Sequence, residues 1–298
     1  MIARATGSWH IGVIGGSGLY DGLDLDDAQQ IPVASAFGEP SGPVTMGTLG
    51  GVRFTFISRH GEGHRLAPGQ VNYRANIDVL KRCGVTDVLA LSAIGSLREE
   101  LAPGHFVAVD QVIDRTEGRA RSYFDAGITA HVALAEPVCA RLAGLAADAA
   151  AAAGVEVHRA GCYVAIEGPQ FSTRAESTLY RQWGADVIGM TAMPEARLAR
   201  EAELPYALLG MVTDYDSWRE GEAPVEASAI LSIMRGNVKT ARKALRLLAK
   251  ALPATRPENP IDRALDSAIV SPFAQWDPRA AARLDAVAGR YIAGMRKA

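Results

Sequence analysis

The sequence lacks an excess of charge of either sign, because 31 lysine and arginine residues are balanced by 33 aspartate and glutamate residues among 298. A nucleic-acid-binding surface needs basic residues gathered on one stripe, where they neutralise phosphates. The basic residues here are scattered along the chain. We therefore expect no nucleic-acid partner.

Long hydrophobic runs are also missing. Nowhere do roughly 18 apolar residues, the length that crosses a bilayer, occur together. Residues 1–15 lack the basic segment and apolar run of a secretory signal. We expect a protein that is neither secreted nor inserted in a membrane.

Cysteine is scarce, and its three positions, Cys83, Cys139 and Cys162, are widely spaced. A disulfide framework or a zinc knuckle needs paired cysteines at characteristic spacings. The pattern predicts buried, reduced thiols in a cytoplasmic enzyme.

Hydrophobic residues make up 48% of the chain, enough for a sizeable core. Short runs of β-branched and apolar residues predict strands at 11–14, 52–58, 87–92, 106–113 and 206–213. Helical stretches alternate with them, and two long helices are expected after Pro137 and from Pro224, because proline suits the first turn of a helix. The fold class is therefore α/β.

Three prolines within residues 253–260 separate the main body from a tail. We expect one domain over residues 1–252 and a C-terminal helical extension over 253–298. The tail alone would poorly bury its apolar side chains, which include Leu265, Ile269, Phe273 and Trp276. They must pack on this body or on a neighbouring subunit.

The glycine-rich segment 15–18 follows the first predicted strand, and its turn would let backbone N–H groups and the Ser17 hydroxyl approach an anion. Taken alone the signal is weak, because a tight turn without a ligand has the same composition. A dinucleotide loop fits worse, since the GxGxxG spacing is absent.

Other strand ends carry groups that also suit an anion. Arg59 and His60 end the second strand, where a guanidinium can bind phosphate oxygens, although such a pair is also common as a surface ion pair. Segment 92–96 ends a third strand with small and hydroxyl residues, and Met190-Thr191 ends a fourth. Pro194-Glu195 then opens a helix whose positive end would face the same place. Together these ends predict an anion site at one edge of the sheet.

Two carboxylates, Asp214 and Asp216, follow the last predicted strand. This pattern is typical of a solvated turn or a helix cap. A DxD pair can also hold Mg²⁺, but no further acidic cluster joins it in the sequence, so we expect no metal.

Taken together, these segments resemble the trimeric nucleoside phosphorylase family, and within it the branch that acts on methylthioadenosine. The matching motifs are IGGSGL (14–19), RHG (59–61) through VNYRAN (71–76), GSLREE (95–100), EGPQFS (167–172), GADVI (184–188) and TDYD (213–216). They occur in the family's order over about residues 10–252.

The resemblance implies a central mixed, twisted sheet flanked by helices, a homotrimer, no cofactor, and inorganic phosphate as co-substrate. It implies a phosphate site made by Ser17, Arg59, His60, Ser92, Ala93 and Thr191. The activity it implies is phosphorolysis of 5'-deoxy-5'-methylthioadenosine to adenine and 5-methylthioribose 1-phosphate.

The nucleoside would be bound by residues from several segments. The resemblance places Met190 against the ribose, Phe171 against the purine face, and Asp214 with Asp216 around the base edge; both Met190 and Phe171 could instead be plain core residues. A methylthio pocket would be formed by Ala227, Ile230 and Leu231, and a hydroxyl could be bound by His64 and His131.

Asp214 is the candidate general acid, which would protonate N7 of the leaving purine. Burial would raise its pKa, and its second oxygen can accept a hydrogen bond from a 6-amino group. Ser172 stands where the family's guanine and hypoxanthine enzymes carry a glutamate. Both features favour adenine over 6-oxopurines.

Two positions depart from the family pattern. Gly189 stands where close relatives tend to have asparagine, and Ile94 replaces a small polar or thiol residue. Three rival functions stay open at this point: phosphorolysis of methylthioinosine or another 6-oxopurine nucleoside, a nucleoside hydrolase, and a nucleoside-binding module without turnover.

Overall fold

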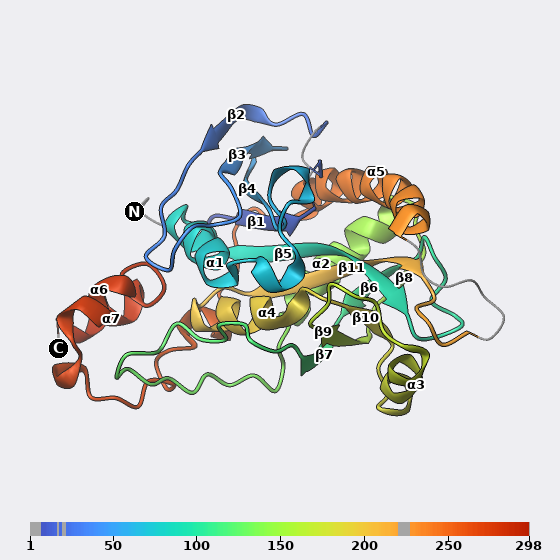
Figure 1. Cartoon of the computed structure of the whole chain (residues 1–298). Coiled ribbons are helices and arrows are strands. Elements are labelled where there is room, and N and C mark those ends of the chain that lie inside the picture. The colour runs from blue at the N-terminus through green and yellow to red at the C-terminus, as the bar shows by residue number, and fades with distance from the viewer. Residues whose placement is uncertain (1–6, 17, 20–21, 220–226, 298) are drawn as a thin grey trace.

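The structure is a computed structural model that describes residues 7–16, 18–19, 22–219 and 227–297; the side chains of 227–229 lie outside the description. Within these residues, eleven strands form one sheet with helices packed around it (Figure 1). The sheet contains both parallel and antiparallel pairs. The predicted α/β fold with a mixed sheet is confirmed.

The strands are β1 His10–Gly15, β2 Asp26–Ile31, β3 Val44–Leu49, β4 Val52–Ser58, β5 Asp87–Ser96, β6 Phe106–Val109, β7 Gln111–Arg115, β8 Val157–His158, β9 Cys162–Ile166, β10 Val187–Gly189 and β11 Tyr206–Asp214. The helices are α1 Tyr73–Arg82, α2 Ala140–Ala152, α3 Arg174–Gln182, α4 Ala192–Glu201, α5 Ala227–Ala251, α6 Pro278–Arg283 and α7 Gly289–Met295, with short 3-10 turns at Glu62–His64, Pro68–Gln70, Pro260–Arg263 and Phe273–Gln275.

Strand β5 organises the sheet. It pairs in parallel with β1 over its first residues and with β11 along most of its length, and in antiparallel with β10 at Gly95 and Ser96. Strand β4 lies beside β1, also in parallel. The carboxyl ends of β4, β1, β5 and β11 therefore meet at one edge of the sheet, where side chains from distant segments can converge.

The strand predicted over 106–113 is wrong as a single element. The structure divides it at Asp110 into β6, which pairs with β11, and β7, which pairs with β9. The backbone N–H of Asp110 donates to the Gly161 carbonyl, and its side chain accepts from the Gly161 N–H. These bonds tie Asp110 to the residue before β9, so the chain leaves β11 and joins β9 at this point.

Two pairs of helices flank the sheet. Helices α2 and α5 pack on each other and on β11, whereas α1 and α4 pack on each other and α4 also contacts β7 and β9. Both predicted long helices are present; Pro224, the expected start of the second, lies outside the described residues. No described helix is both long and apolar enough to span a bilayer.

The C-terminal tail packs on its own chain. Leu265 and Trp276 are buried in the main core, and Ile269 and Phe273 are half-buried against it. Figure 1 shows α6 and α7 side by side, at the opposite side of the molecule from α3. The sequence left open whether the tail packs on residues 1–252 of the same chain or on a neighbouring subunit. It packs on the same chain, so its apolar residues no longer argue for a neighbouring subunit.

Candidate active site

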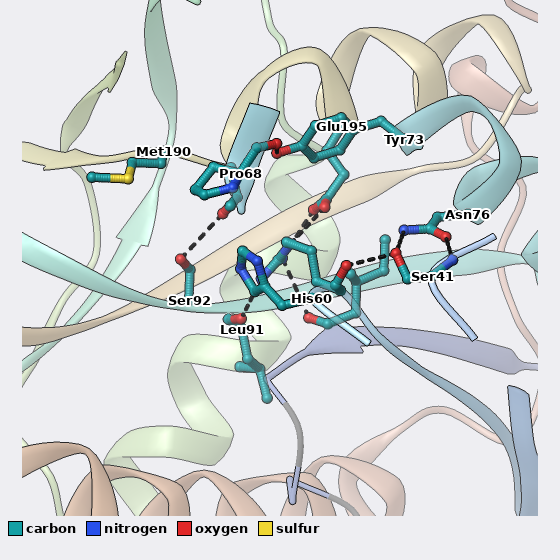
Figure 2. Close-up of polar contacts among 12 residues, drawn as sticks. Ser41, His60, Pro68, Tyr73, Asn76, Leu91, Ser92, Met190 and Glu195 are labelled. Carbon is teal, nitrogen blue, oxygen red and sulfur yellow. Dashed lines mark hydrogen bonds and ion pairs between the residues drawn. The ribbon is translucent and has the colours of Figure 1, made fainter. Parts of the chain in front are cut away.

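Arg59 lies at the end of β4 with 2% of its surface exposed. Its Nε and Nη2 donate to both carboxylate oxygens of Glu195 at 2.7 and 3.0 Å, and Nη1 donates to the Leu91 carbonyl at 3.2 Å (Figure 2). A weaker contact joins Nη2 to the Ile14 carbonyl at 3.5 Å. The surface ion pair considered from the sequence is thus ruled out, and the bidentate face of Arg59 is turned toward Glu195.

His60 is buried beside Arg59. Its Nδ1 lies 2.9 Å from the Leu66 carbonyl, which can only accept, so Nδ1 carries a proton and Nε2 is the remaining nitrogen. Burial, and next the charge of Arg59, lower the pKa of His60 to about 4. His60 is therefore neutral at pH 7, with the His64 ring stacked on it at 4.2 Å between centroids.

Ser92, Ala93 and Thr191 form the next part of this edge. The Ser92 and Thr191 hydroxyl oxygens lie 3.3 Å apart, and Ser92 also donates to the Ala93 carbonyl at 3.0 Å. Ser92 and Met190 are labelled on the same side of the close-up in Figure 2, and His60 directly follows Arg59 in the chain. Arg59 joins the group because it binds the carbonyl of Leu91, the residue before Ser92. We call Arg59, His60, Ser92, Ala93 and Thr191 the strand-end cluster.

Asp214 lies at the end of β11, directly across from Gly95 of β5. One carboxylate oxygen accepts from the Thr213 hydroxyl at 2.7 Å and the other from the Asp216 N–H at 2.9 Å. Burial raises the pKa of Asp214, although both hydrogen bonds oppose the shift. Thr213 can also donate to the Ile94 carbonyl at 3.2 Å, so its hydroxyl has two alternative acceptors.

Asp216 lies beside Asp214, in a left-handed conformation with φ of 47°. Ser177 of α3 donates a short hydrogen bond to its carboxylate. Burial raises the pKa of Asp216 to about 6. The two aspartates, Thr213 and Ser177 thus form a second polar group, which β5 joins to the strand-end cluster.

Met190 and Phe171 belong to two segments that touch. The Met190 thioether lies over Gly168, where a side chain would overlap its sulfur. Met190 is half-buried, and 43% of the Phe171 surface is exposed. Phe171 is therefore not a plain core residue, and neither side chain is fully buried.

The remaining predicted residues are not joined to these groups. Ser17 and the Ala227 side chain lie outside the described residues. Ile230 is half-buried and Leu231 is 61% exposed at the start of α5. His131 is exposed, and its N–H donates to Ala268 of the tail; no described contact links it to the strand-end cluster.

The two departures from the family pattern each have a compensating neighbour. A side chain at Gly189 would overlap the hydroxyl of Tyr163, which instead accepts from the Thr191 N–H at 3.3 Å. A side chain at Gly210 would overlap Ile94. The larger Ile94 therefore fits because its side chain lies over a glycine of β11, and Gly189 leaves room for Tyr163.

Sequence reasoning missed the residues that support the predicted ones. Glu195 was expected only as part of a helix start, and Thr213, Ser177 and Tyr163 were not singled out. Ser172, which the sequence did single out, lies next to Phe171, and its buried hydroxyl has no hydrogen-bond partner among the described residues.

Comparisons with known proteins agree with this architecture. The sequence model of the phosphorylase superfamily matches residues 10–252. The chain is 53% identical to S-methyl-5'-thioadenosine phosphorylase of Cereibacter sphaeroides over 95% of this chain and 99% of the relative, and 48% identical to that of Geobacter sulfurreducens over the same shares. A crystal structure of methylthioadenosine phosphorylase from an antarctic soil metagenomic library superposes with a TM-score of 0.89 at 41% identity, covering 95% of this chain and 99% of the other. The methylthioadenosine phosphorylase of Schistosoma mansoni in complex with adenine gives a TM-score of 0.77 at 36% identity, over 82% and 91% of the two chains. The chain therefore belongs to the phosphorylase superfamily.

Proposed function

We propose that this protein uses inorganic phosphate to cleave 5'-deoxy-5'-methylthioadenosine into adenine and 5-methylthioribose 1-phosphate. The main support for this proposal is the position of Asp214, whose half-buried carboxyl has a raised pKa and lies at the same sheet edge as the strand-end cluster. The relatives named as methylthioadenosine phosphorylases support it, since they match nearly the whole chain.

Phosphate would bind at the strand-end cluster. Because Glu195 occupies the bidentate face of Arg59, the contribution we assign to Arg59 is its positive charge and one N–H of Nη1, rather than a two-point clamp. The hydroxyls of Ser92 and Thr191 are close enough together to bind one anion. Neutral His60 could accept a hydrogen bond at Nε2 from the protonated oxygen of HPO₄²⁻.

Bond cleavage makes the sugar cationic and leaves negative charge on the purine. Phosphate oxygens beneath C1' would stabilise the first charge, and Asp214 would protonate N7 to neutralise the second. Thr213 suits this step: its hydroxyl can donate to the Ile94 carbonyl while Asp214 is protonated, and to the carboxylate once the proton has moved to N7. The acid proton is thus left for N7.

Two groups of residues would select the substrate, one at the purine base and one at the 5' end. The Asp214 carboxylate can accept from a 6-amino group but would face the O6 acceptor of a 6-oxopurine. At the other end, Ile230 and Leu231 would contact the methylthio group, together with Ala227. An apolar pocket leaves a 5'-hydroxyl unpaired, a difference of about 1–3 kcal/mol against adenosine.

The test is adenine release from methylthioadenosine with and without phosphate. Strictly phosphate-dependent release is expected. Equal release in phosphate-free buffer would indicate a hydrolase, and binding without release would indicate a nucleoside-binding module. Faster cleavage of methylthioinosine than of methylthioadenosine would assign the protein to the 6-oxopurine branch.

We further propose a homotrimer that needs no cofactor or metal, with phosphate as the co-substrate. His131 supports the assembly, because it is exposed and no described contact joins it to the strand-end cluster, as expected of a residue that reaches a neighbour's site. Light scattering that gave a fully active monomer would refute this. The cytoplasmic location stays a prediction. The three cysteines are free, as expected, but only Cys83 and Cys139 are buried, whereas Cys162 is half-buried.

A further inference from the structure

Arg119 lies in the loop after β7 and belongs to none of the sequence motifs above. Its side chain is 2% exposed, and its guanidinium is surrounded by acceptors. These are the Glu167 carboxylate at 2.9 Å, the carbonyls of Met190 at 2.6 Å, Glu167 at 2.7 Å and Met193 at 2.8 Å, and the Tyr73 hydroxyl at 3.1 Å.

The acceptors come from three segments that hold the predicted ligands. Met190 and Met193 flank Thr191 at the junction of β10 and α4. Glu167 directly follows β9 and begins the loop that carries Phe171. Tyr73 begins α1 and donates in turn to the Pro68 carbonyl at 2.9 Å, in the segment that follows His60 and His64.

Arg119 has few hydrogens left for a substrate, because its N–H groups point to protein acceptors. Its charge is balanced by Glu167, whose carboxylate also accepts from the Glu117 N–H at 2.8 Å. A planar guanidinium can serve several acceptors at fixed angles, whereas a lysine ammonium is a single point with three donors. Only an arginine can therefore hold all three segments in one geometry.

We propose that Arg119 is a positioning residue, which fixes the Met190–Thr191 segment and the Phe171 loop relative to each other in the binding arrangement. The expected change in kinetics rests on the proposed function, whereas the expected change in the mobility of the two segments does not. Without Arg119, both segments should move more freely, and the ribose and purine contacts should be lost together.

Arg119→Lys keeps the charge and removes the multi-point geometry. We expect kcat/KM for methylthioadenosine to fall by at least about 10-fold, chiefly through a higher KM for the nucleoside, because small misplacements of binding groups are costly. Hydrogen exchange should become faster in residues 167–172 and 190–194. Arg119→Ala should regain part of its activity in millimolar guanidinium chloride, and none in ammonium chloride.

Arg256→Lys is the matched control. Arg256 is another buried arginine, with 10% of its side chain exposed, but it binds Asp87 and Asp262 at the opposite end of β5 from Ser92. It should lose stability while keeping its KM values and its exchange rates in the two segments. Unchanged exchange in Arg119→Lys, or equal kinetic losses in both variants, would overturn the proposal. A wild type that releases no adenine would refute the proposed function instead, and the exchange rates would still decide the role of Arg119.

Discussion

Two regions of the molecule each bury a carboxylate against an arginine, and they do so to different depths. At the sheet edge, Arg59 and Glu195 are 2% and 1% exposed. At the junction with the tail, Glu203 is 1% exposed but its partner Arg290 is 35% exposed and also binds Asp266. An ion pair contributes less where one partner is exposed, because water screens that partner's charge and can reach the site when the partner is removed. The same chemical pair should therefore matter more at the sheet edge.

Arg59→Ala should cause the largest loss of stability. It leaves the Glu195 carboxylate buried with only the Tyr206 hydroxyl, at 3.0 Å, as a described hydrogen-bond donor. Loss of one partner of a buried pair costs about 3–5 kcal/mol. Urea unfolding should show this loss, and the KM for phosphate should rise because a positive charge has left the strand-end cluster.

The double variant Arg59→Met/Glu195→Met separates the two effects. With both charges replaced by apolar side chains, most of the stability should return, whereas phosphate binding should stay weak. Recovery of both properties would mean that Arg59 has no part in binding the anion.

Asp214→Asn should have the next largest effect, and it acts on chemistry rather than on folding. The amide keeps the shape of Asp214 but cannot transfer a proton to N7, so kcat/KM for methylthioadenosine should fall by roughly 100-fold or more. Methylthioinosine should lose less or improve, since the amide can donate to O6. The measurement is kcat/KM for methylthioadenosine, adenosine, methylthioinosine and inosine on both proteins.

The methylthio preference should be unchanged in Asp214→Asn, because the predicted 5' pocket is a separate set of residues. A variant that leaves all four substrate ratios alone would show that Asp214 does not recognise the base. Thr213→Val is a useful companion, because it removes the hydroxyl that donates to the charged carboxylate but leaves the carboxyl itself.

Arg290→Ala addresses the tail region. Glu203 would keep a hydrogen bond from the Leu265 N–H at 3.1 Å, and Arg290 is already partly in water. We expect a loss of about 1–2 kcal/mol in the free energy of unfolding, less than for Arg59→Ala, with unchanged KM values in assays on folded protein. A loss as large as that of Arg59→Ala would show that the exposure of one partner does not weaken the pair.

The sequence predicted the residues at the sheet edge much better than the packing of the tail. Arg59, Ser92 and Thr191 were found because strand ends converge in an open α/β sheet, and the structure does bring them together. The sequence did not reveal the residues that support them, since Glu195 lies 136 residues from Arg59 and most contacts of Arg119 are with backbone carbonyls, which any residue can supply. The surface on which the tail packs could not be predicted either. Apolar side chains indicate that the tail must be buried, but they do not indicate which surface buries it.

The smallest expected effect concerns pH, at the link between α3 and the base-edge aspartates. Burial raises the pKa of Asp216 to about 6 from an ordinary value of 3.8, while the hydrogen bond from Ser177 opposes the shift. A raised carboxyl pKa means that the folded state holds its proton between pH 3.8 and about 6 when the unfolded chain has lost it. Stability from this group is thus complete below pH 3.8 and is lost as the pH rises to about 6. Activity should change in the opposite direction, because the charged carboxylate is the form that accepts from an amine.

Ser177→Ala tests whether Asp216 controls the pH dependence of turnover. Without the Ser177 hydroxyl the charged form of Asp216 loses a donor, so its pKa should rise and the acid limb of the kcat/KM profile should move to higher pH. Asp214 lies next to Asp216 and its pKa is also raised, so the limb reports the pair rather than one residue.

Thr178→Ala is the matched control on the same helix, because the Thr178 hydroxyl donates to the Arg174 carbonyl at an exposed position. It should leave the profile in place. An acid limb that stays where it is in Ser177→Ala would mean that Asp216 does not control the pH dependence of turnover.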